Sequence, residues 1–417
     1  MNILHVVPYF PPTRRHGGVP EAVLALVRAQ IGLGHSVTVL TSDAGLSPED
    51  SHPEIALQWI KQGGLTALGI LRRTPVLYVR NRFAILAERG KFFTPRLTAP
   101  EVLARLPMVI DAAHFHEVHI PGYWSAAREF ARRGAVVCVS PHGSLNPPTH
   151  RGVKRIFHRC LDPWLRAGWF SQCGAYFALG RAEREQLLRG GIPPERIHIL
   201  PHGLPEWEPS HSIPLPFPVE ANPAVVTFLV LGRLHESKGV VQVFKAFQAL
   251  WKNNRRPRLV FCGPDEGCAV FIRNGCHQRG IPFETGHIGA SAGVYILSPV
   301  PHVILPALFV LADWTICPSP YEAFGLVPIE SLHWGVPVVA TTGYGCLEYI
   351  PQSSPLLKII PPSDPAALRT ALEECLVSPR GERPASGWNP GLPSWREVAE
   401  RVVEVYQGSV MQRSVGY

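Results

Sequence analysis

The sequence predicts an α/β protein with two domains, each built around a parallel β-sheet. Three observations support this fold class. The length of 417 residues suits two domains, strand-like apolar runs alternate with helical patterns in both halves, and a proline-rich stretch without periodicity separates the halves. We therefore expect a first domain over residues 1–205, a linker over 206–223 and a second domain over 224–393. An expected last helix, about residues 394–417, could pack back on the first domain.

The first domain opens on an apolar run that ends at prolines, Asn2–Pro8, and a glycine-containing loop follows it. Apolar residues then recur at helical spacing from Glu21 to Ile31, and residues 35–41 read as a second strand. This strand, loop, helix and strand form one βαβ unit, which predicts a parallel sheet. The alternation continues with expected strands at 109–116, 135–140, 174–179 and 197–200, and expected helices at 124–133 and 181–189.

The same alternation restarts after the linker. Residues 224–231 read as a strand, 240–252 as a helix and 258–262 as a strand. Two such domains leave a cleft between the carboxyl ends of their strands, where ligands of this fold class bind.

The composition narrows the classes of protein. A hydrophobic fraction of 46% excludes a disordered chain. The formal net charge is +8 although charged residues make up only 17%, so we expect either one basic surface or a generally basic protein. A basic surface suits nucleic acid, anionic lipid or nucleotide ligands alike. We find no nucleic-acid-binding module and expect no nucleic-acid partner.

Cysteine usage and targeting signals point to the cytoplasm. The nine cysteines include no Cys-x-x-Cys pair, so neither a disulfide framework nor a zinc site is indicated. We expect them to be buried and reduced. The N-terminus lacks the features of a signal peptide. The most apolar stretch, residues 291–318, is interrupted by prolines and an aspartate and does not predict a membrane span.

One segment mixes bases with aromatic residues. It reads HRGVKRIFHR from His150 and, after Cys160, LDPWLRAGWF. This mixture suits peripheral contact with an anionic membrane, and it fits an ordinary surface helix equally well. We therefore expect a cytoplasmic protein that could associate peripherally with the inner face of the cell membrane.

The first motif with chemical content is LGRLHESKG, which starts at Leu231. Gly232 permits a sharp turn after a strand, and Arg233 and Lys238 precede a helix. Two cations beside a helix N-terminus suit a diphosphate. Two solvated loop charges are the alternative, because basic residues are common in loops.

The second motif is PSPYEAFGLVPIESLHWGVPVVATTGYG, which starts at Pro318. Gly325 permits close backbone approach, and a helix begins near Pro328. Glu330 then lies in this helix and Glu322 in the loop before it. One carboxylate can accept hydrogen bonds from a ribose diol, and the other can face the cationic centre of glycosyl transfer. A single glutamate near a helix start could also serve only the helix dipole.

These motifs carry a resemblance to a known family. The sequence resembles the retaining GT-B glycosyltransferases called glycosyl transferase group 1 or family 4. The matching pieces are the Glu-x7-Glu motif with its flanks, LGRLHESKGV, GPDEG, and GGVPEAVLALVRAQIGLGHSVTVLTS near the N-terminus. The resemblance implies the GT-B architecture, with two Rossmann-like domains facing an interdomain cleft.

The resemblance also assigns roles to residues. It implies that Arg233 and Lys238 neutralise the nucleotide diphosphate, that Glu322 lies near the donor sugar, and that Glu330 binds the ribose. His116, in AHFHE, resembles a histidine near the transferred sugar, and a structural role for it stays open. The resemblance places the remaining donor-binding positions at two glycine loops and at one segment that offers backbone amides: Gly17, Gly18, Gly232, Phe324, Gly325 and Leu326.

The resemblance implies transfer of a sugar from a nucleotide-sugar donor, linked to UDP, GDP or ADP, to a glycan or lipid-linked acceptor with retention. The setting would be cell-envelope or exopolysaccharide synthesis. No Asp-x-Asp motif occurs, and we expect no metal. Ala323 and His202 replace residues usual in the family, which keeps open a catalytically silent sugar- or lipid-binding partner subunit. A GT-B nucleotide-sugar epimerase is a weaker alternative, because the Arg233/Lys238 and Glu322/Glu330 pairs argue against it.

Overall fold

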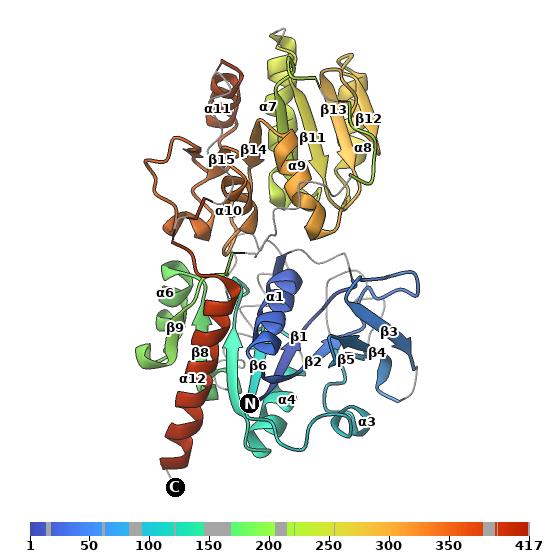
Figure 1. Cartoon of the computed structure of the whole chain (residues 1–417). Helices are drawn as coiled ribbons and strands as arrows, with labels where there is room; N and C mark the ends of the chain where they lie inside the picture. The colour runs from blue at the N-terminus through green and yellow to red at the C-terminus, as the bar shows by residue number, and fades with distance from the viewer. Residues whose placement is uncertain are drawn as a thin grey trace. The chain divides into compact units, whose positions relative to one another are not determined.

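A computed structural model gives the fold. It describes residues 1–13, 18–60, 63–82, 94–120, 122–145, 168–204, 215–220, 222–253, 255–377, 388–389 and 391–415. The chain divides into two compact units (Figure 1), which we call the N-terminal unit (Met1–Pro205 with Pro393–Tyr417) and the C-terminal unit (Glu206–Leu392).

The sheet of the N-terminal unit is mainly parallel. Its described strands follow the order β3-β4-β5-β2-β1-β6-β7-β8-β9, with antiparallel pairing only at β3/β4 and β4/β5. The central strands are buried along nearly their whole length, as expected for a parallel sheet covered on both faces. The strands are β1 (Asn2–Val7), β2 (Ser36–Ser42), β3 (Ile55–Trp59), β4 (Leu65–Leu71), β5 (Thr74–Val79), β6 (Ala112–His116), β7 (Val136–Ser140), β8 (Ala175–Ala178) and β9 (Ile197–Ile199).

Helices cover this sheet, and one of them comes from the end of the chain. The helix α12 (Trp395–Val415) packs on α1 (Gly18–Gly32). Its residues Val398, Val402 and Tyr406 share one apolar core with residues of α1, β1 and β2. The other described helices of the unit are α3 (Pro100–Leu103), α4 (Tyr123–Arg132) and α6 (Arg181–Arg189), with short 3-10 turns η1 (Phe170–Gln172) and η2 (Pro194–Arg196).

The sheet of the C-terminal unit is entirely parallel over the described residues, in the order β12-β13-β11-β10-β14-β15-β16. Its strands are β10 (Thr227–Leu231), β11 (Arg258–Cys262), β12 (Phe283–Thr285), β13 (Gly293–Leu297), β14 (Trp314–Cys317), β15 (Val338–Thr341) and β16 (Leu357–Ile360). Its helices are α7 (Val240–Lys252), α8 (Ala269–His277), α9 (Leu305–Leu311), α10 (Leu326–His333) and α11 (Pro365–Val377), with η3 (Glu236–Lys238), η4 (His302–Ile304) and η5 (Gly345–Glu348). The α/β class predicted from the sequence is therefore confirmed in both units.

Part of the predicted linker belongs to the C-terminal unit. The amide of Glu220 donates to the Ile288 carbonyl at 2.8 Å, and the Ile288 amide donates to the Pro218 carbonyl at 3.0 Å. Leu215 and Phe217 pack against the apolar core on that side of the sheet. Residues 205–214 of this region lie outside the described residues.

Two further observations concern the expected compartment. The eight cysteines in the described part of the chain are buried and form no disulfide. Among the described helices, none has both the length and the apolar character needed to cross a membrane. The segment that suggested membrane contact runs from His150 to Phe170, and its residues 150–167 lie outside the described residues.

Candidate active site

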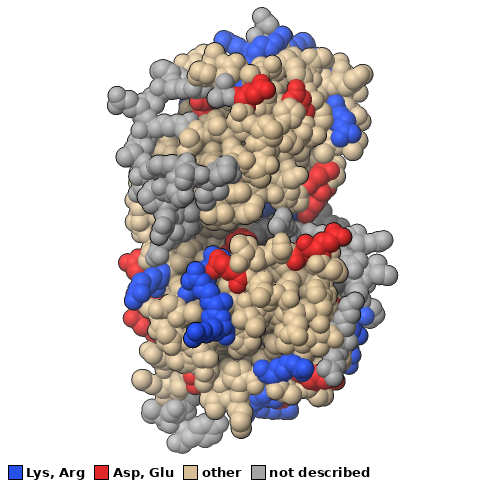
Figure 2. All heavy atoms as spheres, turned by 45° about the vertical axis from the view of Figure 1, so that its right-hand side comes forward, with Lys and Arg blue, Asp and Glu red and all other residues tan. Residues whose placement is uncertain are grey.

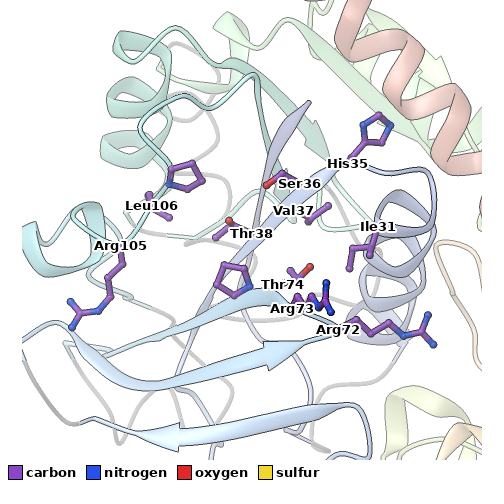
Figure 3. A pocket seen from close by; sticks show the side chains of 12 residues that line it. Ile31, His35, Ser36, Val37, Thr38, Arg72, Arg73, Thr74, Arg105 and Leu106 are labelled. Atoms are coloured by element: carbon purple, nitrogen blue, oxygen red, sulfur yellow. The ribbon is translucent and has the colours of Figure 1, made fainter.

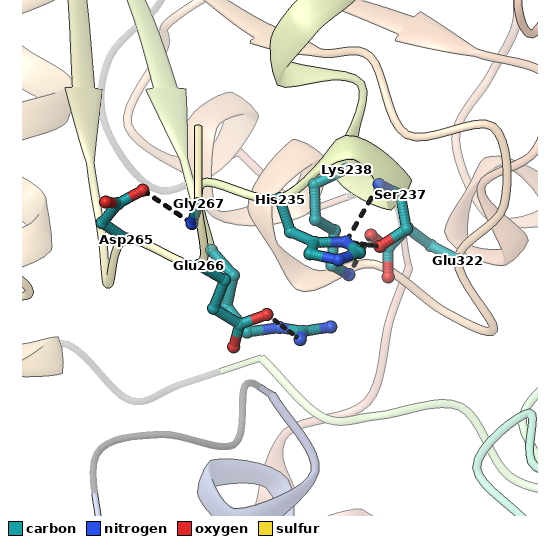
Figure 4. Close-up of polar contacts among 8 residues, drawn as sticks. His235, Ser237, Lys238, Asp265, Glu266, Gly267 and Glu322 are labelled. Atoms are coloured by element: carbon teal, nitrogen blue, oxygen red, sulfur yellow. Dashed lines mark hydrogen bonds and ion pairs between the residues drawn. The ribbon is translucent and has the colours of Figure 1, made fainter. Parts of the chain in front are cut away.

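The loop after β10 holds Lys238 in a fixed position. The His235 ring accepts a hydrogen bond from the Ser237 amide at 3.1 Å and so caps η3. Gly239 follows in a left-handed conformation (φ 73°), and a Cβ there would lie 2.4 Å from the Pro318 carbonyl oxygen. Only glycine therefore fits between η3 and the loop after β14. In this position the Lys238 ammonium pairs with Glu322 Oε1 at 2.5 Å (Figure 4).

The loops after β10 and β11 are joined by close backbone contact. A Cβ on Gly263 would lie 2.0 Å from the Gly232 carbonyl oxygen. The Leu234 amide donates to the Pro264 carbonyl at 2.8 Å. On this framework Arg233 Nη1 lies 2.7 Å from Glu266 Oε2, and about a third of each side chain is exposed, 33% and 32%. The guanidinium is thus oriented by one carboxylate and still open to solvent.

Asp265 orders the turn beside this pair. Its Oδ1 accepts hydrogen bonds from the amides of Gly267, Cys268 and Ala269 at 2.9–3.1 Å, and Figure 4 shows the first of these. Amides at a helix start have no partner within the helix, so a carboxylate there stabilises α8. The turn that carries Glu266 is therefore held in place by its neighbour.

Glu330 lies in α10 and is almost completely buried, with 3% of its side chain exposed. The His302 Nε2 atom lies 2.8 Å from its Oε1 atom. The buried carboxylate is therefore oriented by an imidazole from η4 as well as by its own helix. Burial without a partner would be costly for a charged group.

The start of α10 has the backbone geometry expected for a site of close approach. Gly325 adopts a φ of 83°, and a Cβ there would lie 2.3 Å from Tyr344 Cδ1 and 3.3 Å from Glu322 Cβ. The N-cap residue is Gly325, which has no side chain to cap this helix. The amides of Leu326 and Val327, which precede Pro328, can therefore donate hydrogen bonds to an anion. Phe324, in contrast, is buried with 3% exposed, so its ring belongs to the packing of the loop.

The structure thus brings some predicted residues together and adds others. Lys238 and Glu322 form one ion pair, whereas Arg233 pairs with Glu266. Sequence reasoning missed Glu266 as a partner, although it stands within the GPDEG motif. It also missed His302, because nothing in the sequence near that residue relates it to Glu330.

The N-terminal unit places its predicted residues differently. Gly17 lies outside the described residues, and Gly18 is the first residue of α1. His116 ends β6 and is only 1% exposed. Its Nε2 lies 2.9 Å from His5 Nδ1 and its Nδ1 lies 2.9 Å from His142 Nε2. Burial lowers the pKa of His116 well below the ordinary value, and neighbouring histidines lower it further.

A metal is one candidate for this histidine cluster. Ring nitrogens of His5, His114 and His116 lie within 4.8 Å of one another. His114 donates to or accepts from Tyr406 OH at 2.6 Å and Ser140 Oγ at 2.8 Å. His5 contacts His116 at 2.9 Å through Nδ1 and a glutamine through Nε2. Every ring nitrogen of the three histidines therefore has a hydrogen-bond partner, which fits a hydrogen-bonded network better than a set of metal ligands.

A cavity of about 410 Å³ lies in the N-terminal unit and is basic (Figure 3). Its lining includes Arg72, Arg73 and Arg105. The first two occupy a tight turn between β4 and β5 with φ values of 45° and 73°, a conformation that costs energy for non-glycine residues. On the face shown in Figure 2, basic and acidic groups are interspersed.

Family models match both halves of the chain. Residues 16–206 match the description Glycosyltransferase Family 4, and residues 216–385 match Glycosyl transferases group 1. A GDP-mannose:cellobiosyl-diphosphopolyprenol alpha-mannosyltransferase from Xanthomonas campestris is 23% identical over 82% of this chain and 78% of its own length. Among solved structures, a sucrose-phosphate synthase from Thermosynechococcus elongatus superposes with a TM-score of 0.64 at 16% identity, covering 98% of this chain and 99% of that one.

Other curated relatives match shorter stretches. A D-inositol 3-phosphate glycosyltransferase from Corynebacterium urealyticum is 29% identical over 42% of each chain. A probable transglycosylase from Burkholderia thailandensis is 43% identical over 16% of this chain and 17% of its own length. The chain thus spans less than half the length of these two relatives. The two family models nevertheless cover most of the sequence, and the residues they match form the two parallel-sheet units described above. The chain belongs to the GT-B glycosyltransferases of glycosyl transferase group 1 and family 4.

Proposed function

We propose that this glycosyltransferase uses a nucleotide-sugar donor and transfers the sugar with retention to a glycan or lipid-linked acceptor in cell-envelope or exopolysaccharide synthesis. One observation carries the proposal. In the C-terminal unit the Lys238–Glu322 ion pair lies next to the uncapped start of α10. An ammonium, a carboxylate and helix amides gathered in one place suit a sugar diphosphate.

Each group then has a role in the proposed reaction. Lys238 and Arg233 stabilise the charge that grows on the leaving diphosphate, and the amides of Leu326 and Val327 hold its oxygens. Glu322 faces the positive charge that develops on the sugar. Glu330, oriented by His302 at 2.8 Å, accepts hydrogen bonds from the ribose hydroxyls.

The bond changes follow from retention by front-side displacement. The bond between the anomeric carbon and the diphosphate oxygen breaks, and a bond to the acceptor oxygen forms on the same face. The acceptor proton passes to the leaving phosphate oxygen. The cations take the part that a divalent metal plays in other transferases, so we expect turnover to persist in the presence of a chelator.

The mannosyltransferase from Xanthomonas campestris supports the choice of substrates, because its name gives a nucleotide-linked sugar as donor and a lipid diphosphate as acceptor. The donor nucleotide of this chain could be UDP, GDP or ADP. We expect the donor to occupy the C-terminal unit and the acceptor the N-terminal unit. We also expect the protein to associate peripherally with an anionic membrane face.

Nucleotide release from a panel of UDP-, GDP- and ADP-linked sugars, with and without chelator, tests the proposal. We expect release with one nucleotide class and its loss in Glu330→Ala. Lys358→Ala serves as a matched control, because Lys358 forms a separate ion pair with Glu374 at 2.7 Å in the same unit. Binding without release would favour the silent partner subunit, and conversion of the donor sugar to its epimer would favour the epimerase.

A further inference from the structure

Three histidines of the N-terminal unit form one continuous hydrogen-bonded chain. It starts at Gln30 in α1, whose Oε1 lies 2.7 Å from His5 Nε2. It continues from His5 Nδ1 to His116 Nε2 at 2.9 Å, and from His116 Nδ1 to His142 Nε2 at 2.9 Å. The chain thus runs from α1 through β1 and β6 to the loop that follows β7.

The direction of every hydrogen bond in this chain follows from its first member. The Gln30 carbonyl oxygen can only accept, so His5 carries its proton on Nε2. The His5 Nδ1 atom then accepts from His116 Nε2–H, and His116 Nδ1 accepts from His142 Nε2–H. Burial lowers the pKa of His5 and of His142 to about 4 and that of His116 still further, so all three rings are neutral at pH 7.

The hydrogen-bonded series ends at a nitrogen that can accept a hydrogen bond but has no donor in the part of the chain that the structure describes. His142 Nδ1 is buried and has no hydrogen-bond partner among the described residues. The His142 ring lines a cavity of about 30 Å³, whose other lining residues are mostly apolar and include Ser140 and His202. A cavity of this volume has room for one water molecule or one hydroxyl group. A buried acceptor without a partner costs free energy, and a ligand hydroxyl would remove that cost.

The loop that carries His142 is held in an unusual conformation. His142 has a φ of 50°, in the left-handed region. The next amide, of Gly143, donates to Glu183 Oε1 at 2.6 Å, and the Leu179 amide donates to Glu183 Oε2 at 2.9 Å. Glu183 therefore ties the loop after β7 to the loop after β8. Strained residues held by their surroundings at strand ends are frequent at ligand sites.

We propose that His142, through Nδ1, is an acceptor that the N-terminal unit offers to a hydroxyl group of a sugar ligand, and that the hydrogen bonds from Gln30 through His5 and His116 fix its tautomer. The inference rests on the proposed function, because it requires a sugar as ligand. The hydroxyl belongs either to the donor sugar or to the sugar of the acceptor. His142 is then a residue in contact with the ligand, and His5, which bonds Gln30 and His116, is a positioning residue.

Nitrogen-15 NMR of the histidine rings in the full chain tests the tautomer directly. We expect His142 to carry its proton on Nε2 before any ligand is added, with an unprotonated Nδ1. A proton on Nδ1, or a charged ring at pH 7, would overturn the proposal. This readout does not need a turnover assay, so it is independent of whether the proposed function holds.

The same spectra separate the two sources of the hydroxyl. UDP-glucose, GDP-mannose and ADP-glucose are added in turn, each compared with its nucleotide alone. A shift of the His142 Nδ1 resonance with a nucleotide sugar, but not with the nucleotide, assigns the donor sugar. If a donor binds without this shift, a disaccharide acceptor is added next. No shift with either ligand, while calorimetry shows the donor bound, would overturn the proposal, whereas no donor binding at all would overturn the proposed function.

Kinetics of two His142 variants complete the test. We expect His142→Phe to lower sugar transfer by about tenfold to a hundredfold and to leave nucleotide affinity unchanged. His142→Gln, which keeps a donor toward His116 and an acceptor toward the cavity, should recover part of the loss. His198→Gln is the matched control, because His198 lies in β9 of the same unit and does not belong to the hydrogen-bonded series of histidines. Equal activity of His142→Phe, His198→Gln and the unmodified protein would contradict the proposal.

Discussion

The two units place their titratable side chains in opposite ways. In the C-terminal unit, the Arg233–Glu266 and Lys238–Glu322 pairs carry opposite charges and keep 21–33% of each side chain exposed. In the N-terminal unit, burial lowers the pKa of the clustered histidines and keeps them neutral, and hydrogen bonds join several of them. Exposed charges suit an ionic ligand such as a diphosphate, whereas a neutral buried network suits hydroxyl groups. The two units therefore suit ligand groups of different charge.

Among the substitutions considered, we expect the largest loss of activity from Arg233→Ala. We expect Arg233→Ala to lower kcat/KM by about a hundredfold to a thousandfold, because the growing charge on the leaving diphosphate loses a donor. Steady-state kinetics with the preferred donor measure this. Arg369→Ala is the control, since Arg369 pairs with Glu373 on the exposed face of α11. Near-normal turnover of Arg233→Ala would refute the diphosphate role.

The two units should also differ in how much folding stability they lose at acidic pH. His5 and His142 have a pKa of about 4 in the fold against 6.5 as the ordinary value. The unfolded chain therefore binds more protons between these values, and stability falls as pH falls through that window. At pH 5 each of the two histidines should cost about 2 kcal/mol of stability. Burial raises the pKa of Glu183 to about 6, so its contribution has the opposite sign and offsets about 1 kcal/mol.

Hydrogen exchange at pH 7.5 and pH 5.0, corrected for intrinsic rates and read by mass spectrometry, resolves the units. We expect peptides of β1, β6 and β7 to lose protection at pH 5.0 more than peptides of β10, β11 and β14. The C-terminal unit is thus an internal control. Equal loss of protection in both units would contradict the view that buried histidines make the N-terminal unit the more acid-sensitive one.

A smaller effect is expected at Gly325. Its φ of 83° and the 2.3 Å approach of a Cβ to Tyr344 predict that Gly325→Ala destabilises the start of α10 by about 1–3 kcal/mol and weakens donor binding. Thermal unfolding and calorimetric donor binding measure the two consequences. An alanine variant that binds the donor as tightly as glycine would show that close approach is not needed there.

The smallest effect is expected at Gly408, a matched glycine in the exposed face of α12. A Cβ there meets no atom within 4 Å. Because alanine is the better helix former, Gly408→Ala should stabilise the chain by about 1 kcal/mol. A rise in the unfolding midpoint without a change in turnover is the expected result. Destabilisation instead would show that α12 is packed more tightly at this position than the structure indicates.

Much of the fold could be predicted from local patterns. The predicted helices 181–189 and 240–252 and the strand 258–262 agree with α6, α7 and β11 residue for residue. The antiparallel strands β3, β4 and β5 were not predicted, because short strands joined by tight turns lack a long period. Residues 215–220 were assigned to the linker because prolines hide their pairing with Ile288, which is a long-range contact.

The sequence predicted those site residues that stand in a short motif and carry a chemically suitable side chain. Lys238 and Glu322 were identified separately, and the structure adds that they form an ion pair. The partnership of Glu330 with His302 depends on how η4 and α10 pack, so no local signal could reveal it. The histidine chain likewise joins residues 25–111 positions apart in the sequence.

The central claim is that the C-terminal unit binds a nucleotide diphosphate through Lys238. Calorimetric titration of the full chain with UDP, GDP and ADP tests it most directly, with Lys238→Ala and Lys358→Ala measured alongside. We expect one nucleotide to bind, with affinity lowered at least about tenfold in Lys238→Ala and unchanged in Lys358→Ala. Binding of equal strength in Lys238→Ala, or no binding of any of the three nucleotides, would contradict the account.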